Sequence, residues 1–405
     1  MTALRSPLLR ALADGVSGGV PGAEEQFWLR VEALGTPLVE PDPEGAADHR
    51  LVTFLWRDDP AHPATDVLAL VHTVTDRDRH AGDLAPHLMR RLPDTSVWAI
   101  EHRLRADHRA SYQFHPGHGG REEILRTDRD AWLGVLDRAL PDPLNREPAL
   151  PSRDGRSPAS VVSLPDSPAQ PHAARRPGIA RGALRTASVD GRTLQVHLPP
   201  GHDPAGGPYP VAVLLDGEMW GPVLGVGDML DGLYADGALA PAVTLLVDTM
   251  GNRMVDLSCN GGFVDWLADT LLPWAATEFG ASREPARTVV AGQSAGGLTA
   301  AFAAHRRPDR FGLALSQSGS FWWPDDPELG AEWLTRQYAE SERRPVRLHL
   351  EVGLQEWMLL GENRRLRDVL RTRGYDFSYE EFNGGHDYAC WRGGLASGLV
   401  RLLGA

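Results

Sequence analysis

The sequence contains no lysine, so all 41 of its basic residues are arginine. This absence excludes several kinds of chemistry at once. No Schiff-base lysine, no lysine of a phosphate-binding loop and no serine–lysine dyad is possible. Every cationic contact to a ligand must therefore come from arginine or histidine.

The sequence also has no net positive charge, only two cysteines and no long apolar run. The net charge of −13 argues against a nucleic-acid partner and against binding to an anionic membrane surface. Cys259 and Cys390 are the only cysteines, too few for a disulfide framework, which predicts a reduced, cytoplasmic setting. No run approaches the roughly 18 apolar residues of a membrane span, and the arginine-containing segment 1–22 has no sustained apolar stretch, so we expect no secretory signal.

At 405 residues the chain is too long for one compact core and suits two domains. Within residues 1–150, short apolar runs at 51–57, 67–74, 96–103 and 110–114 are separated by polar turns, a spacing typical of a small β-sandwich. Proline, serine and arginine dominate residues 151–183, which we interpret as a linker. From 184 to 405 strand-like and helix-like segments alternate, which predicts a mainly parallel sheet covered on both faces.

A short segment in this second domain carries the strongest chemical signal. The apolar run Val289-Val290-Ala291 leads into Gly292-Gln293-Ser294-Ala295-Gly296, and an alanine-rich helical segment follows. This is the G-x-S-x-G nucleophile elbow, in which a tight turn between a buried strand and a helix exposes one serine. The predicted fold is therefore α/β: a C-terminal α/β-hydrolase domain preceded by an N-terminal β-sandwich-like domain.

A serine nucleophile needs a base and an acid, which follow it in this fold in the order Ser, Asp or Glu, His. His386 lies in Asn383-Gly384-Gly385-His386-Asp387, where the last loop of the sheet is expected, and is the predicted base. For the acid we favour Glu356, just past the strand that ends near Val352. Glu351, Glu362 and Asp387 remain alternatives, as does a Ser–His dyad.

The developing oxyanion of an ester also needs hydrogen-bond donors. The backbone N–H of Ala295 is the first predicted donor, and the strand-end glycine Gly217 supplies the second.

Several stretches, in the same order along nearly the whole chain, resemble the enterochelin (enterobactin) esterases. They are Val52-Thr53-Phe54-Leu55-Trp56-Arg57-Asp58, Asp142-Pro143-Leu144-Asn145, Leu214-Leu215-Asp216-Gly217-Glu218, the elbow, the segment 315–324 (LSQSGSFWWP) and the segment 384–395 (GGHDYACWRGGL). The resemblance implies serine-esterase chemistry on the trilactone of catecholate siderophores, and an N-terminal domain that helps to shape the substrate site. It also supports Ser294 and His386 as catalytic and keeps Glu356 as the favoured acid.

A ferric tris-catecholate substrate carries a triple negative charge and three flat aromatic rings. Arg253, after an apolar strand of the sheet, is the predicted cationic contact, because ligands of such sheets gather at the carboxyl ends of the strands. Trp322, Trp323 and Trp391 are candidates for packing on the catechol rings, with core packing as the alternative.

Iron enters only as part of the substrate, so we predict no cofactor and no catalytic metal. The seven histidines between His72 and His118 lack metal-ligand spacing, and we predict that they lie on the surface.

Two other functions stay open. A general carboxylesterase or feruloyl-type acyl esterase would use the same triad without an anion-selective pocket. A non-hydrolytic siderophore-binding protein would explain the arginines and aromatic residues but would leave a complete elbow and histidine unused.

Overall fold

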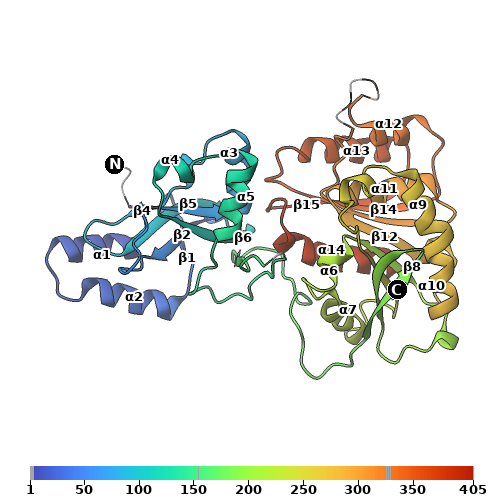
Figure 1. Cartoon of the computed structure of the whole chain (residues 1–405), viewed down its shortest axis with the longest axis horizontal. Helices are drawn as coiled ribbons and strands as arrows, with labels where there is room; N and C mark the ends of the chain where they lie inside the picture. Colours follow the sequence, from blue (N-terminus) through green and yellow to red (C-terminus); the bar gives the residue numbers. More distant parts are fainter. Residues whose placement is uncertain (1–3, 154, 325, 327, 329, 405) are drawn as a thin grey trace. The chain divides into compact units, whose positions relative to one another are not determined.

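The computed structural model describes residues 4–153, 155–324, 326, 328 and 330–404 (Figure 1). The chain divides into two compact units. The first unit comprises Met1–Pro168 together with Asn383–Ala389, and the second comprises Ala169–Phe382 together with Cys390–Ala405. The segment 383–389, which carries His386, thus belongs to the first unit although it follows the last strand of the second.

The first unit contains two antiparallel sheets. One has the order β1-β2-β5-β4 and the other the order β3-β6-β7. Their strands are β1 (Leu38–Pro41), β2 (His49–Arg57), β3 (Asp66–Val71), β4 (Arg90–Arg91), β5 (Val97–Arg105), β6 (Arg109–Gly117) and β7 (Ser160–Ser163). The helices of this unit are α1 (Pro7–Ser17), α2 (Ala23–Leu34), α3 (His72–His80), α4 (Arg121–Ile124) and α5 (Arg129–Arg138).

The two sheets pack face to face through side chains that alternate along each strand. Val52 and Phe54 of β2 share one buried cluster with Val67, Ala69 and Val71 of β3. The intervening residues of the same strands face the other way and meet helices, because successive side chains of a strand point to opposite faces. On those outer faces α1 and α2 cover β2 and β5, and α4 and α5 cover β3. Burial on both faces explains why these strands read as continuous apolar runs.

The expected linker differs from the structure in its first half. β7 lies inside residues 151–183 and pairs antiparallel with β6, from Tyr112 opposite Ser160 to Arg109 opposite Ser163. The first unit therefore extends to Pro168, and β8 begins at Ala183. β7 was not predicted from the sequence because it is only four residues long and lies among proline and serine residues.

The second unit is built on one eight-stranded sheet with the order β15-β14-β13-β12-β10-β11-β9-β8. The six strands from β15 to β11 pair in parallel, and β9 and β8 extend the sheet antiparallel. The strands are β8 (Ala183–Val189), β9 (Arg192–Leu198), β10 (Val211–Leu215), β11 (Val243–Val247), β12 (Thr288–Gln293), β13 (Leu313–Gln317), β14 (Arg347–Gly353) and β15 (Asp376–Phe382).

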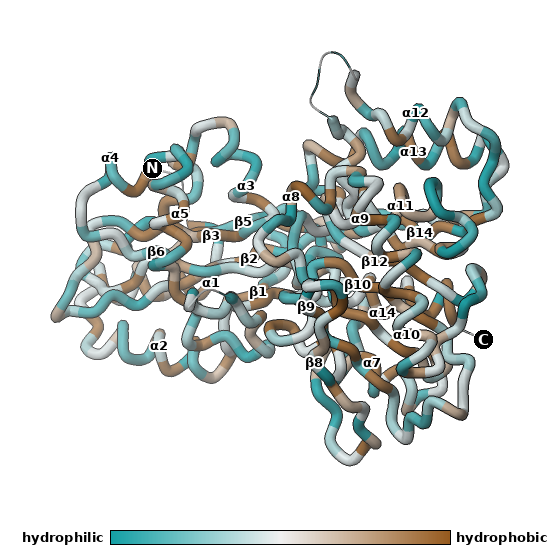
Figure 2. Tube along the Cα trace, turned by 45° about the vertical axis from the view of Figure 1, so that its right-hand side comes forward, coloured by the Kyte–Doolittle hydropathy of each residue, from teal (hydrophilic) through white to brown (hydrophobic). Residues whose placement is uncertain are grey.

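Helices cover both faces of this sheet (Figure 1). They are α6 (Gly217–Trp220), α7 (Val226–Ala235), α8 (Arg253–Asp256), α9 (Gly261–Trp266), α10 (Leu272–Phe279), α11 (Ala295–Arg306), α12 (Trp333–Glu340), α13 (Leu360–Thr372) and α14 (Tyr388–Leu403). Central strands such as β10 and β12 are buried along their whole length, and Figure 2 shows their apolar composition. The predicted fold class is confirmed. No helix in the described part of the chain combines the length and apolar character needed to cross a bilayer.

Candidate active site

Ser294 occupies a strained turn between β12 and α11. Its φ of 59° and ψ of −121° lie in a region that non-glycine residues rarely adopt. The backbone is held there from both sides, because its N–H donates to the carbonyl of Gln317 (3.0 Å) and its carbonyl accepts from the N–H of Ser320 (3.0 Å). The turn therefore presents the Ser294 hydroxyl at the carboxyl end of β12, as a nucleophile elbow requires.

The two glycines that flank Ser294 are required by close packing. A Cβ on Gly292 would lie 2.5 Å from the carbonyl carbon of Gly296, so no side chain fits between strand and helix. A Cβ on Gly296 would lie 3.3 Å from Oδ2 of Asp216. The backbone of α11 therefore excludes a side chain at position 292, whereas a side chain at position 296 would require Asp216 to shift slightly.

The two predicted oxyanion donors lie at equivalent places on neighbouring strands. Ala295 is the first residue of α11, after β12, and Gly217 is the first residue of α6, after β10. The first N–H groups of a helix have no acceptor within the helix and carry its positive dipole end, which suits an anion. Gly217 also has a packing reason, because a Cβ there would lie 2.3 Å from the carbonyl carbon of Leu246 in β11.

Glu356 is buried, with 5% of its surface exposed, just beyond β14. Its Oε1 accepts from the hydroxyl of Ser318 (2.5 Å) and from the backbone N–H of Gly353 (2.8 Å). The Ser318 hydroxyl in turn accepts from Nε1 of Trp391 (2.9 Å). The carboxylate is thus held at the carboxyl end of the sheet, the edge that also carries Ser294.

The three alternative acids are held in other interactions or are buried away from a position that suits the acid of the triad. Glu362 forms an exposed ion pair with Arg365. Asp387 accepts from the backbone N–H of Ser111 (2.5 Å) and of Ala389 (2.8 Å), which ties its carboxylate to the backbone. Glu351 is buried beneath the strand ends, where burial raises its pKa from 4.5 to about 8. Glu356 therefore keeps its place as the favoured acid.

The loop with His386 is anchored within the first unit. The backbone N–H of Arg109 donates to the carbonyl of Asn383 (3.1 Å). Oδ1 of Asn383 contacts Nδ1 of the buried His108 (3.2 Å), whose Nε2 contacts the hydroxyl of Thr73 (2.9 Å). A Cβ on Gly385 would lie 3.1 Å from Cα of Thr73, so the loop lies directly on α3.

Arg253 makes a bidentate ion pair within the second unit. Its Nε lies 2.6 Å from Oδ1 of Asp216, and its Nη2 lies 2.9 Å from Oδ2. Nη2 also donates to the carbonyl of Gln293 (3.3 Å), the residue before Ser294. The Asp216 side chain is 3% exposed and that of Arg253 is 32% exposed. Arg253 thus stabilises the elbow, and about a third of its side chain is exposed.

The three candidate tryptophans have different surroundings. Trp391 is 4% exposed and donates to Ser318, which favours packing over the predicted contact with a substrate. Trp323 is partly buried against the main core and meets Trp333 edge to face. Trp322 is half-buried. Of the three tryptophans it is therefore the best candidate for contact with a ligand.

The prediction that the seven histidines between His72 and His118 lie on the surface is wrong for three of them. His87, His108 and His115 are buried. Burial lowers the pKa of all three, that of His115 to about 4, so they pack as neutral rings. Among the residues that the structure describes, no group of three or more histidine, cysteine, aspartate or glutamate side chains is arranged to hold a metal ion.

Sequence reasoning missed two glutamines near Ser294. Gln293 and Gln317 are the last residues of β12 and β13, and their side chains are bonded to each other (Nε2 of Gln293 to Oε1 of Gln317, 2.6 Å). One signal was present: each glutamine ends an apolar strand and directly precedes a serine, Ser294 or Ser318.

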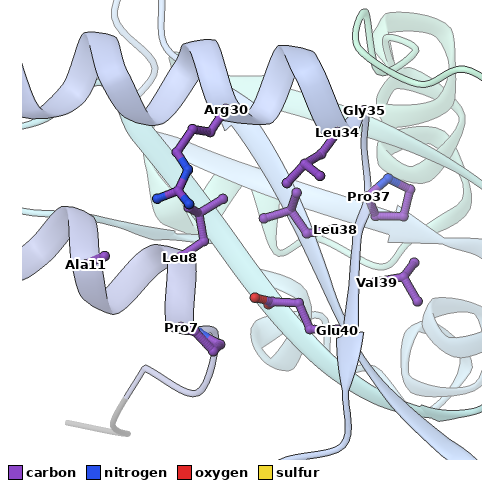
Figure 3. A pocket seen from close by; sticks show the side chains of 10 residues that line it. All are labelled: Pro7, Leu8, Ala11, Arg30, Leu34, Gly35, Pro37, Leu38, Val39 and Glu40. Carbon is purple, nitrogen blue, oxygen red and sulfur yellow. The ribbon is translucent and has the colours of Figure 1, made fainter.

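The first unit contains a cavity of about 520 Å³ (Figure 3). Leu8, Leu34 and Leu38 form apolar walls between α1, α2 and β1, with Arg30 and Glu40 as charged groups. None of its lining residues is a predicted site residue.

Comparison with known proteins covers both units. A family model described as a putative esterase matches residues 188–402, and one described as enterochelin esterase, N-terminal, matches residues 51–173. The iron(III) enterobactin esterase of Escherichia coli K12 is 34% identical over 369 residues, which cover 87% of this chain and 90% of its own. The iron(III) salmochelin esterase of Escherichia coli O6:H1 is 32% identical over 413 residues, 98% of each chain.

A solved structure agrees with these matches. The enterobactin esterase of Shigella flexneri, crystallised in the presence of enterobactin, has a TM-score of 0.78 at 31% identity, covering 93% of this chain and 97% of its own. The resemblance inferred from the sequence is confirmed. With both domains matched and curated relatives aligned over nearly its full length, the chain belongs to the enterochelin (enterobactin) esterase family of carboxylic ester hydrolases.

Proposed function

We propose that this protein is a serine esterase that hydrolyses the trilactone backbone of ferric, enterobactin-like catecholate siderophores, releasing iron and 2,3-dihydroxybenzoyl-serine units. The near full-length match to iron(III) enterobactin and salmochelin esterases carries the proposal. The strained, glycine-flanked Ser294 supports the serine chemistry. The proposal includes a cytoplasmic location, for which the low cysteine content is the support, and a reaction that uses no cofactor.

In the proposed mechanism, His386 takes the proton of Ser294 as the hydroxyl attacks a lactone carbonyl. The backbone N–H groups of Ala295 and Gly217 bind the oxyanion of the tetrahedral intermediate. The seryl alcohol leaves with the proton from His386. Water then attacks the acyl-enzyme with His386 again as base, and Ser294 regains its proton. Glu356 orients the imidazole and stabilises the imidazolium.

For substrate recognition we propose Arg253, whose side chain is 32% exposed, as a contact to the anionic ferric tris-catecholate, with Trp322 as a stacking partner for a catechol ring. Breaking the ring of the trilactone removes the preorganisation of the three catecholates, so iron is held less tightly after each cleavage.

Product analysis tests the function directly. Ferric and iron-free enterobactin are incubated with the wild-type protein and separated by liquid chromatography with mass spectrometry. We expect linear trimer, dimer and monomer of 2,3-dihydroxybenzoyl-serine to appear in turn. An intact siderophore beside rapid cleavage of a p-nitrophenyl ester would indicate a general carboxylesterase or feruloyl-type esterase, and tight binding with neither ester cleaved a siderophore-binding protein.

The acid of the triad has its own test. Glu356→Gln keeps the size of the side chain but removes the charge that stabilises the imidazolium, so we expect kcat to fall by about 10³–10⁴-fold. Glu362→Gln is the matched control, because Glu362 pairs with Arg365 on α13 and should leave kcat within about threefold of wild type. Equal kcat for both variants would reject Glu356 in favour of a Ser–His dyad.

A further inference from the structure

A chain of buried side-chain hydrogen bonds crosses the sheet beneath the elbow. Nε1 of Trp220 donates to Oε1 of Gln293 (2.9 Å), Nε2 of Gln293 to Oε1 of Gln317 (2.6 Å), and Nε2 of Gln317 to Oε1 of Glu351 (2.5 Å). All four residues are at most 3% exposed. The chain runs from α6 through the ends of β12 and β13 to β14.

The donor and the acceptor of each hydrogen bond in this series are fixed by the groups at its two ends. An indole N–H can only donate, so Gln293 must accept with its oxygen and donate with its nitrogen. Gln317 must then do the same, and its amide nitrogen also donates to the carbonyl of Trp391 (2.8 Å). The last member of the chain, Glu351, must therefore offer an accepting oxygen.

The chain is joined to the nucleophile through the backbone. Gln293 directly precedes Ser294, and the carbonyl of Gln317 accepts from the N–H of Ser294 (3.0 Å). The carbonyl of Glu351 accepts from the N–H of Ser318 (2.7 Å), whose hydroxyl contacts Glu356. A shift of the glutamine side chains would therefore move the residues that hold the elbow in its strained conformation.

The carboxyl group of Glu351 fits tightly into its place. A Cβ on Gly394 of α14 would lie 2.0 Å from its Oε1, so the helix makes room for this group by having glycine there. Glu380 of β15 is directly opposite in register and pairs with Arg401 of α14, and Glu356 lies beyond the end of β14. His349, two residues earlier on the same strand, is buried and contacts Ser378.

We propose that Glu351 is a positioning residue for Ser294, acting through Gln317 and Gln293, and that it does so as the neutral carboxylic acid. The proposal rests on the proposed function in taking Ser294 as the nucleophile. The neutral acid accepts the Gln317 amide hydrogen without placing a third negative charge beside Glu380 and Glu356. Ionisation would bury a negative charge among those two carboxylates, and the carboxyl group would leave its tight place beside Gly394.

The charge state near neutral pH agrees with this role. Burial raises the pKa of Glu351 from 4.5 to about 8, with the charges of Glu380 and Glu356 acting in the same direction and the Gln317 hydrogen bond opposing them. The raised pKa means that the folded protein keeps this proton where the unfolded chain has lost it. Stability from the neutral acid is complete below pH 4.5 and is lost as the pH rises towards and through about 8.

The test is the pH profile of kcat for ferric enterobactin from pH 6 to about pH 10, with the nonenzymatic rate subtracted. We expect the wild-type kcat to fall above pH about 8. Glu351→Gln, which copies the shape and neutrality of the acid, should keep kcat at pH 7 within about threefold, leave KM unchanged and abolish the alkaline fall. Glu351→Ala removes the acceptor of Gln317 and should lower kcat about tenfold or more relative to wild type at pH 7.

Further variants separate the possible failures. Glu380→Gln removes a charge that raises the Glu351 pKa, so the alkaline fall should move to lower pH. An alkaline fall that persists in Glu351→Gln overturns the proposal even if Glu351→Ala fails to fold, and so does wild-type kcat in a folded Glu351→Ala. If Ser294→Ala keeps wild-type activity, the proposed function itself fails. Thermal unfolding adds a readout without turnover: between pH 5 and 9 the wild type should lose more stability than Glu351→Gln, and equal losses would count against the neutral acid.

Discussion

Replacing Ser294 with alanine is expected to lower kcat for ferric enterobactin by about 10⁴–10⁶-fold without unfolding the protein. Loss of the hydroxyl removes the proposed nucleophile, and the oxyanion donors and binding contacts that remain account for only a small residual acceleration in serine hydrolases. The elbow itself should survive, because it is held by the backbone bonds to Gln317 and Ser320 and by the absence of side chains at Gly292 and Gly296. Product formation by mass spectrometry and thermal unfolding of the same samples check both parts.

Ser320→Ala is the matched control. Its hydroxyl lies 3.3 Å from that of Ser294, so it shares the local environment without standing at the elbow. We expect this variant to keep kcat within about tenfold of wild type. Comparable losses in the two variants would indicate that the local hydroxyl pair, and not Ser294 as nucleophile, governs the reaction.

The elbow was predictable because its information is local. A buried strand, a turn whose glycines leave no room for side chains, and a helix stand next to each other in the sequence, and the structure shows the same order at β12, Ser294 and α11. The fold class followed from alternation of strands and helices in the same way. Four strands of the first unit, β2, β3, β5 and β6, were also found, because runs such as Val67–Val71 are apolar enough to be buried on both faces. The short strands β1, β4 and β7 were not predicted.

Contacts between distant parts of the chain were not predictable. Gln293, Gln317 and Glu351 meet only because parallel strands bring their carboxyl ends to one edge, and nothing in the spacing of the three residues indicates this. Burial of histidines depends on the same long-range contacts. His108 looks like a surface residue in a polar stretch, yet its ring is buried with a partner, Asn383, that lies 275 positions away.

Removing the guanidinium of Arg253 is expected to destabilise the second unit strongly. The carboxylate of Asp216 is 3% exposed and is bound by two nitrogen atoms of Arg253. Arg253→Ala therefore takes away the paired cation of a buried anion, which costs about 3 kcal/mol of unfolding free energy or somewhat more. Denaturation in urea measures this loss, and Arg253→Lys, which keeps the charge but not the bidentate geometry, should lie between the alanine variant and wild type.

A double variant distinguishes the stabilising ion pair of Arg253 with Asp216 from the proposed role of Arg253 in substrate binding. Asp216→Asn removes the buried charge, so adding it to Arg253→Ala should restore a large part of the lost stability if the ion pair is the cause. The KM for ferric enterobactin should stay raised in the double variant, since the Arg253 guanidinium is still absent. If Arg253→Ala is as stable as wild type and only KM rises, the pair with Asp216 carries little energy and Arg253 serves the substrate alone. If instead KM recovers together with stability, Arg253 acts on the substrate only by holding Asp216 and the elbow in place.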